Sequence, residues 1–124
     1  MKALLLIAHG SRLPASNEEV RELARMLGDR LAAEFDIVDC AFLELAAPTI
    51  DQAIDGCVTR GCTRLTLLPY FLAAGRHLRD DIPAIVAAKQ QQYPGIRITT
   101  SPYLGQADGL LDILVALSRQ APSS

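Results

Sequence analysis

The stretch Leu4-Leu5-Leu6-Ile7-Ala8-His9-Gly10-Ser11-Arg12 decides the fold of this 124-residue chain. It is an unbroken apolar run that ends at a histidine, a glycine and a polar loop. A short apolar run between polar segments is typical of a strand buried on both faces of a parallel sheet. His9 then stands at the carboxyl end of that strand, where open α/β sheets bind their ligands.

Further strands are expected over residues 37–43, 64–70 and 96–100, and a segment with helical spacing of its apolar residues follows each strand. This βαβαβαβα order predicts a parallel sheet with right-handed crossovers. The first and third strands are the most apolar, so we place them at the centre. The predicted fold class is α/β: a four-stranded parallel sheet of order 2-1-3-4 with helices on both faces.

The helices also carry signals at their ends and along one side. Ser16 with Glu19 predicts a capping box for the first helix. Pro48-Thr49 is expected to open the second helix, and an aspartate with Pro83 the third. The last helix has an apolar stripe that we expect to be buried, formed by Leu110, Ile113, Leu114 and Leu117.

Composition restricts the class of protein. Half of the residues are hydrophobic and 21% are charged, which predicts one globular domain over residues 1–120 with a frayed tail over 121–124. A net charge of −2 argues against a nucleic-acid partner, and no apolar stretch is long enough to cross a membrane. Three cysteines without a Cys-x-x-Cys spacing favour reduced thiols in a cytoplasmic protein.

The only two histidines of the chain, His9 and His77, both follow apolar strands. In a sheet of order 2-1-3-4 the first and third strands flank the switch point, so we expect the two histidines to face each other across one crevice. Neutral imidazoles bind Fe²⁺, Co²⁺, Ni²⁺ and Zn²⁺ and accept protons near neutral pH. Each histidine alone has a plainer interpretation, as a structural hydrogen-bonding group or as a solvated loop residue.

Other polar residues are expected around this crevice. Glu44 ends the second strand, where it would be a third ligand, a proton acceptor or simply an exposed glutamate. Three arginines in the nearby loops would pair with an anionic ligand or merely face solvent. Glycines in these loops allow close backbone approach or permit turns. The predicted substrate-binding residues are Gly10, Ser11, Arg12, Gly75, Arg76 and Arg79.

Four segments carry a family resemblance: residues 8–12 (Ala-His-Gly-Ser-Arg), 41–44 (Ala-Phe-Leu-Glu) with Pro48, 68–72 (Leu-Pro-Tyr-Phe-Leu) and 75–83 (Gly-Arg-His-Leu-Arg-Asp-Asp-Ile-Pro). In this order and spacing they resemble the small single-domain form of the sirohydrochlorin cobaltochelatases, the class II tetrapyrrole metal chelatases. The resemblance implies a three-layer αβα chelatase-like domain and a cytoplasmic enzyme of cobalamin or related tetrapyrrole biosynthesis.

The resemblance also implies an activity and its participants. It implies insertion of a divalent metal into sirohydrochlorin, with Co²⁺ expected and Fe²⁺ or Ni²⁺ as alternatives. The metal is then a substrate, and no tightly bound cofactor is expected. His9 and His77 would hold the metal, Glu44 would help to accept protons, and the protein would pair as a homodimer.

Two other functions are compatible with the residues. Histidine phosphatases also place His-Gly after a first strand. Their motif is similar to Arg-His-Gly, whereas Ala8 stands before His9 in this chain. A protein that carries metal or tetrapyrrole without catalysing insertion is the stronger competitor. Stoichiometric binding of both ligands without acceleration of metallation would distinguish this carrier from a chelatase.

Overall fold

The structure is a computed structural model that describes residues 1–73 and 75–122, with residues 77 and 78 described by their backbone alone. All of its strands run parallel, in the order β2-β1-β3-β4. The strands are β1 (Lys2–Ala8), β2 (Ile37–Phe42), β3 (Arg64–Pro69) and β4 (Arg97–Thr100). The predicted α/β class, strand order and parallel direction are confirmed.

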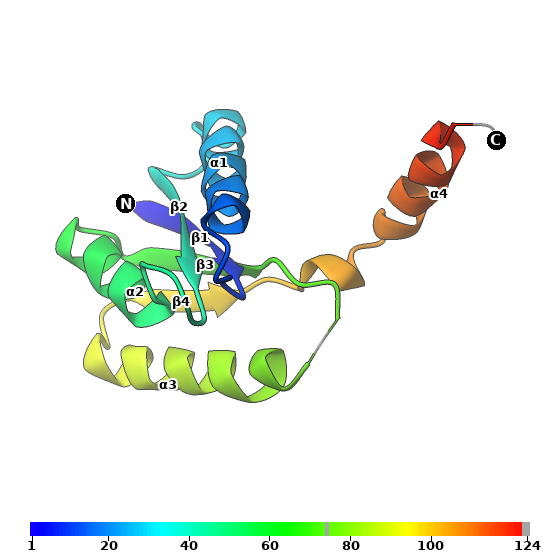
Figure 1. Cartoon of the computed structure of the whole chain (residues 1–124). Coiled ribbons are helices and arrows are strands. Elements are labelled where there is room, and N and C mark those ends of the chain that lie inside the picture. The colour runs from blue at the N-terminus through cyan, green and yellow to red at the C-terminus, as the bar shows by residue number, and fades with distance from the viewer. Residues whose placement is uncertain (74, 123–124) are drawn as a thin grey trace.

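Helices connect and follow the strands in the predicted alternation. They are α1 (Pro14–Arg30), α2 (Ile50–Thr59), α3 (Ile82–Gln92) and α4 (Leu110–Gln120). Two shorter turns lie between them, the π-helical η1 (His77–Asp81) and the 3₁₀-helical η2 (Leu104–Gln106). Figure 1 shows α1 on one side of the sheet and α2 with α3 on the other, which gives the three layers of an αβα domain.

β1 is buried on both faces, as its apolar run predicts. Leu5 and Ile7 lie in the core under α2 and α3, while Leu6 and Ala8 pack with α1 residues such as Ala24. Six consecutive buried residues in β1 explain why it occupies the middle of the sheet. Because side chains alternate between the faces, a shift of one residue would exchange the two cores.

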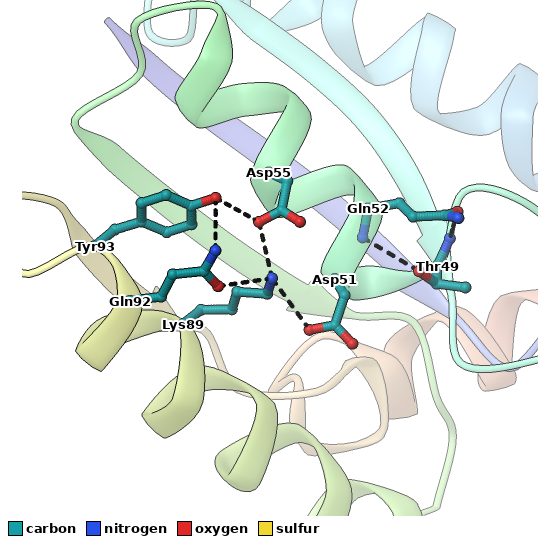
Figure 2. Close-up of polar contacts among 7 residues, drawn as sticks. All are labelled: Thr49, Asp51, Gln52, Asp55, Lys89, Gln92 and Tyr93. Carbon is teal, nitrogen blue, oxygen red and sulfur yellow. Dashed lines mark hydrogen bonds and ion pairs between the residues drawn. The ribbon is translucent and has the colours of Figure 1, made fainter.

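A polar network joins α2 to α3 (Figure 2). The buried Lys89 ammonium lies 2.8 Å from Asp55 Oδ1, 3.1 Å from Gln92 Oε1 and 3.5 Å from Asp51 Oδ1. Tyr93 donates its hydroxyl proton to Asp55 over 2.7 Å. Hydrogen bonds from Lys89 and Tyr93 lower the pKa of Asp55, and the bond to Asp55 raises the pKa of Lys89. These contacts compensate the burial of the lysine and fix the two helices relative to each other.

The structure confirms the predicted start of one helix and contradicts that of another. Thr49 accepts a hydrogen bond from Gln52 N, and the Gln52 side chain accepts one from Thr49 N, so the predicted start of α2 is confirmed. The capping box predicted for Ser16 and Glu19 is wrong. α1 already begins at Pro14, whose ring fixes a helical φ, so both residues lie inside the helix.

The burial predicted for the last helix is wrong as well. α4 projects from the body of the molecule (Figure 1), and none of its residues is buried. Leu114 and Leu117 are each 54% exposed. The apolar stripe is present, but no part of the described chain covers it. The predicted tail, residues 121–124, lies partly outside the described residues, and the extent of the domain stays a prediction.

Candidate functional site

His9 and Glu44 are brought together because the β1–β2 ladder continues beyond the two strands. Leu43 N donates to Ala8 O over 3.0 Å, and Glu44 N donates to His9 O over 3.2 Å. The two side chains meet with His9 Nε2 3.1 Å from Glu44 Oε1. They are 48% and 51% exposed, so the pair is accessible to a ligand at the carboxyl edge of the sheet.

Gly10 makes this close approach possible. Its φ is +96°, and a Cβ at this position would lie 1.8 Å from the carbonyl oxygen of Glu44. Any other residue would therefore be strained and would push the end of β2 away from His9. The turn alone requires this glycine, whether or not a ligand also approaches it.

The loop after Gly10 is held by a residue that the sequence interpretation missed. Asn17 is buried, accepts a hydrogen bond from Ser11 N over 2.9 Å and donates one to Ser11 O over 2.8 Å. Leu13 N donates to Ser11 Oγ over 3.0 Å. Arg12 is exposed between these fixed points. The available signal was that Asn17 stands in line with the apolar stripe of α1, a position where an apolar residue is the rule.

Phe71 borders His9 on its other side. Tyr70 N donates to Ile7 O over 2.7 Å, so the chain after β3 continues alongside β1. The Phe71 ring meets the imidazole edge to face, with centroids 6.4 Å apart and planes at 83°. His9 thus lies between the extensions of β2 and β3, which confirms its predicted position at the switch point.

The structure ties the predicted site residues that follow β3 less closely to His9 than those that follow β1 and β2. Arg76 and Arg79 are exposed, and Arg79 lies in the π-helical turn η1. A Cβ at Gly75 would meet no atom within 4 Å, so no close approach in the described chain requires glycine there. The side chain of His77 lies outside the described residues, and its expected approach to His9 stays a prediction.

Asp81 is a second residue whose place the sequence interpretation underrated. It occupies the N-cap position of α3, but its side chain makes no capping hydrogen bond. With Glu44 it lines a cavity of about 310 Å³, whose other lining residues are Leu43, Ala84 and Ile85. Glu44 therefore stands between His9 on one side and this cavity on the other.

The His9–Glu44 pair has the donors and the spacing of a two-ligand metal site. Histidine nitrogen and carboxylate oxygen bind divalent transition metals at about 2.0–2.2 Å. Two such ligand atoms at right angles around the metal therefore lie about 3 Å apart. The 3.1 Å separation fits this arrangement. Among the side chains that the structure describes, no three His, Cys, Asp or Glu residues gather in one place.

The cysteines are unsuited to metal binding. Cys40, Cys57 and Cys62 are free and buried. Burial raises the pKa of the Cys57 thiol to about 11 and also raises the pKa of Cys40. Since the thiolate is the metal-binding form, Cys40 and Cys57 act as small apolar groups of the core at neutral pH.

Fold and site together define an α/β protein that presents a nitrogen and an oxygen donor at the switch point of a parallel sheet. The model of the CbiX family matches residues 3–121, and the chain belongs to this family. The family resemblance expected from the four sequence segments is thereby confirmed. Among the described residues, no helix is long and apolar enough to cross a bilayer.

Named relatives match most of this chain but only part of their own length. The chain is 34% identical over 111 residues to "Sirohydrochlorin ferrochelatase, chloroplastic" of Arabidopsis thaliana. This match covers 90% of this chain and 48% of the plant protein. It is 41% identical over 86 residues to "Sirohydrochlorin cobaltochelatase" of Methanocaldococcus jannaschii. This match covers 69% of this chain and 59% of the archaeal protein.

A solved structure shares the fold. The sirohydrochlorin chelatase SirB of Bacillus subtilis subspecies spizizenii, solved in complex with cobalt, superposes with a TM-score of 0.80 at 28% identity. The match covers 96% of this chain and 50% of SirB. The chain therefore spans about half the length of SirB and of the plant relative.

Proposed function

We propose that this protein inserts a divalent metal into sirohydrochlorin. The family and the names of the relatives support the reaction class. The observation that carries the proposal is the His9–Glu44 pair, two exposed side chains 3.1 Å apart at the switch point of the sheet. Both side chains bind divalent metals, and both accept protons.

Metallation exchanges one ion for two protons. The macrocycle loses two pyrrole N–H protons as its nitrogens take the metal, so the reaction needs a metal donor and proton acceptors in one place. His9 Nε2 and a Glu44 oxygen hold the incoming metal as neighbouring ligands. After the metal leaves for the macrocycle, the same atoms accept the released protons and pass them to solvent, which both side chains contact.

The macrocycle itself is anionic, because sirohydrochlorin carries eight carboxylates. Arg12, Arg76 and Arg79 are exposed in the loops that follow β1 and β3, where they can pair with these groups. Backbone groups of Gly10 and Gly75 complete the proposed substrate-binding set together with the Ser11 hydroxyl, whose oxygen accepts from Leu13 N and whose proton can be donated to a carboxylate. His77 is proposed as the second histidine of the metal site.

Co²⁺ is the proposed metal, with Fe²⁺ and Ni²⁺ as alternatives. The archaeal relative is named a cobaltochelatase and SirB was solved with cobalt, whereas the plant relative is named a ferrochelatase. Nitrogen and oxygen donors accept all three ions, so the donor set alone does not select among them. Cytoplasmic location and pairing as a homodimer stay predictions.

Anaerobic metallation of sirohydrochlorin, followed by absorbance with Co²⁺, Fe²⁺ and Ni²⁺ in parallel, tests the proposal. We expect the protein to accelerate metallation and the His9→Ala, His77→Ala double variant to lose the acceleration. Glu19→Gln, which removes an exposed carboxylate from α1, serves as the control and should keep the full rate. A double variant as fast as the wild type would refute the proposed site. Stoichiometric binding without acceleration by the wild type would favour a carrier.

A further inference from the structure

One face of α1 reaches the loops that carry both residues of the proposed metal pair. Asn17 and Arg21 are four residues apart in α1, so their side chains lie next to each other on the same face of the helix. Asn17 bonds to Ser11 in the loop after β1. Arg21 donates from Nη2 to Ala47 O over 3.1 Å, in the loop that joins β2 to α2. This connection, residues 43–49, is called the β2–α2 loop below.

The Arg21 guanidinium contacts three partners at once. Its Nη1 donates to Glu18 Oε1 over 2.6 Å within α1, while its Nη2 donates to Ala47 O in the β2–α2 loop. Its Cζ also lies over the ring of Phe42, 5.3 Å from the centroid, which is an attractive cation–π arrangement. Phe42 is fully buried and is the last residue of β2, two positions before Glu44. Arg21 therefore joins α1 to both the end of β2 and the loop that follows it.

The β2–α2 loop turns directly after Glu44 in a strained conformation. Leu45 has a φ of +66°, a left-handed conformation that is unfavourable for a residue with a Cβ. Its side chain is 54% exposed, so packing of the leucine itself contributes little to holding the turn. Strained backbone of this kind persists only where surrounding contacts hold it. The position of Glu44 therefore depends on contacts that neighbouring residues make with this loop.

Arg21 supplies such a contact in the middle of the loop. The backbone hydrogen bond between Glu44 and His9 holds the start of the loop, and the cap of α2 holds its end. Within the described part of the chain, Arg21 is the only side chain that hydrogen-bonds to the backbone of residues 45–48. Loss of Arg21 would leave the turn after Glu44 without a side-chain support.

Arg25 is an ordinary surface arginine of the same helix and provides a comparison. It pairs with Glu22 three positions before it, as Arg21 pairs with Glu18. Its further ion pair also lies within α1. The side chain of Arg25 is 63% exposed, whereas that of Arg21 is 38% exposed. The contacts with β2 and the β2–α2 loop therefore distinguish Arg21 from an arginine that only pairs along the helix.

We propose that Arg21 is a positioning residue of the metal site, which holds the β2–α2 loop against α1 and so keeps the Glu44 carboxylate beside His9. Arg21 acts through Glu44 and is not itself a ligand, because a guanidinium has no lone pair to offer a metal. With Asn17 it makes α1 the common support of the two metal-binding residues. The proposal rests on the proposed function, since it assigns a further residue to the same site.

Cobalt binding in the absence of sirohydrochlorin, measured by calorimetry, tests the position of Glu44 without turnover. We expect Arg21→Met to weaken Co²⁺ binding about 10–100-fold, the usual effect of losing a residue that orients a metal ligand. Arg25→Met is the matched control and should bind Co²⁺ like the wild type. Unchanged affinity in Arg21→Met, or an equal loss in Arg25→Met, would overturn the proposal.

A double-mutant cycle with Glu44→Gln tests whether Arg21 acts through the carboxylate. We expect Arg21→Met to cause no further loss of Co²⁺ affinity once Glu44 is replaced by glutamine. The same non-additivity is expected in the rate of metallation. Equal effects of Arg21→Met in the two backgrounds would show that the residues act independently and would overturn the proposal.

Hydrogen exchange at the Glu44 amide, which donates to His9 O, tests the loop directly. We expect faster exchange there in Arg21→Met but not in Arg25→Met, while the amides of β3 keep the wild-type rate and show that the fold is intact. Arg21→Lys has one nitrogen for two acceptors, so it should give a smaller change in the same direction and replaces Arg21→Met if that variant does not fold. Wild-type exchange at Glu44 in the variant tested would overturn the proposal. A wild type that binds Co²⁺ without metallating sirohydrochlorin would refute the proposed function, whereas cobalt binding and exchange would still decide the role of Arg21.

Discussion

His9 and Glu44 are joined twice, once through the backbone and once through their side chains. Glu44 N donates to His9 O over 3.2 Å, and His9 Nε2 lies 3.1 Å from Glu44 Oε1. The backbone hydrogen bond fixes the distance between the two residues. A metal ion can therefore replace the proton between the imidazole and the carboxylate without movement of the strands. Both side chains are about half exposed, so their removal should affect function far more than stability.

Glu44→Gln is expected to slow metallation about 10²–10⁴-fold, because the amide neither accepts a proton nor replaces a carboxylate ligand. The free energy of unfolding should change by less than about 1 kcal/mol, the usual limit for an exposed pair. Rates at saturating sirohydrochlorin and cobalt binding followed by calorimetry would measure the effect. Glu19→Gln is the control, and an unchanged rate in Glu44→Gln would exclude the carboxylate from the chemistry.

Gly10→Ala is expected to destabilise the protein by about 1–3 kcal/mol, because the φ of +96° and the contact with Glu44 O both oppose a side chain. Chemical denaturation measures the change, and metallation should slow as the His9–Glu44 geometry is lost. Gly56→Ala is the matched control. Gly56 lies inside α2 with no atom within 4 Å of an added Cβ, so alanine there should stabilise the protein by about 0.5–1 kcal/mol. Equal effects of the two substitutions would contradict the role given to Gly10.

The sequence was sufficient for the sheet and for the position of His9. An apolar run buried on both faces has few alternatives, and the carboxyl ends of neighbouring parallel strands meet at one edge. The start of α1 was missed because two local signals compete, and Pro14 starts the helix before Ser16 can cap it. The role of Asn17 was missed because its hydrogen bonds go to Ser11, a loop residue that helical spacing does not identify as a partner. The exposure of α4 was missed because an apolar stripe shows that a helix packs but does not identify what it packs against.

Asn17→Ala is expected to reduce the free energy of unfolding by about 1–3 kcal/mol, since Ser11 N and Ser11 O would lose their partly buried hydrogen-bond partner. The loop that carries Arg12 should also loosen, which would raise KM for sirohydrochlorin more than it lowers kcat. Asn17→Asp keeps the acceptor for Ser11 N but turns a carboxylate oxygen toward Ser11 O, so it should not restore the stability that Asn17→Ala loses. A KM unchanged in a clearly destabilised Asn17→Ala would limit Asn17 to a structural role.

Asp55→Asn should produce a pH-dependent loss of stability through the α2–α3 network. The folded pKa of Asp55 is lowered by hydrogen bonds from Lys89 and Tyr93, so its stabilising contribution is complete above the unfolded pKa of about 4 and disappears as the pH falls through the folded value. At pH 7 we expect a loss of about 1 kcal/mol, a figure reduced for the 43% exposure of the Asp55 side chain. Urea unfolding from pH 7 down to pH 2 should show the curves of variant and wild type converging in acid.

Asp51→Asn is the control, because Asp51 is 59% exposed and 3.5 Å from Lys89 Nζ and should matter less. A difference between Asp55→Asn and wild type that stayed constant down to pH 2 would mean that the carboxylate's charge does not stabilise the fold.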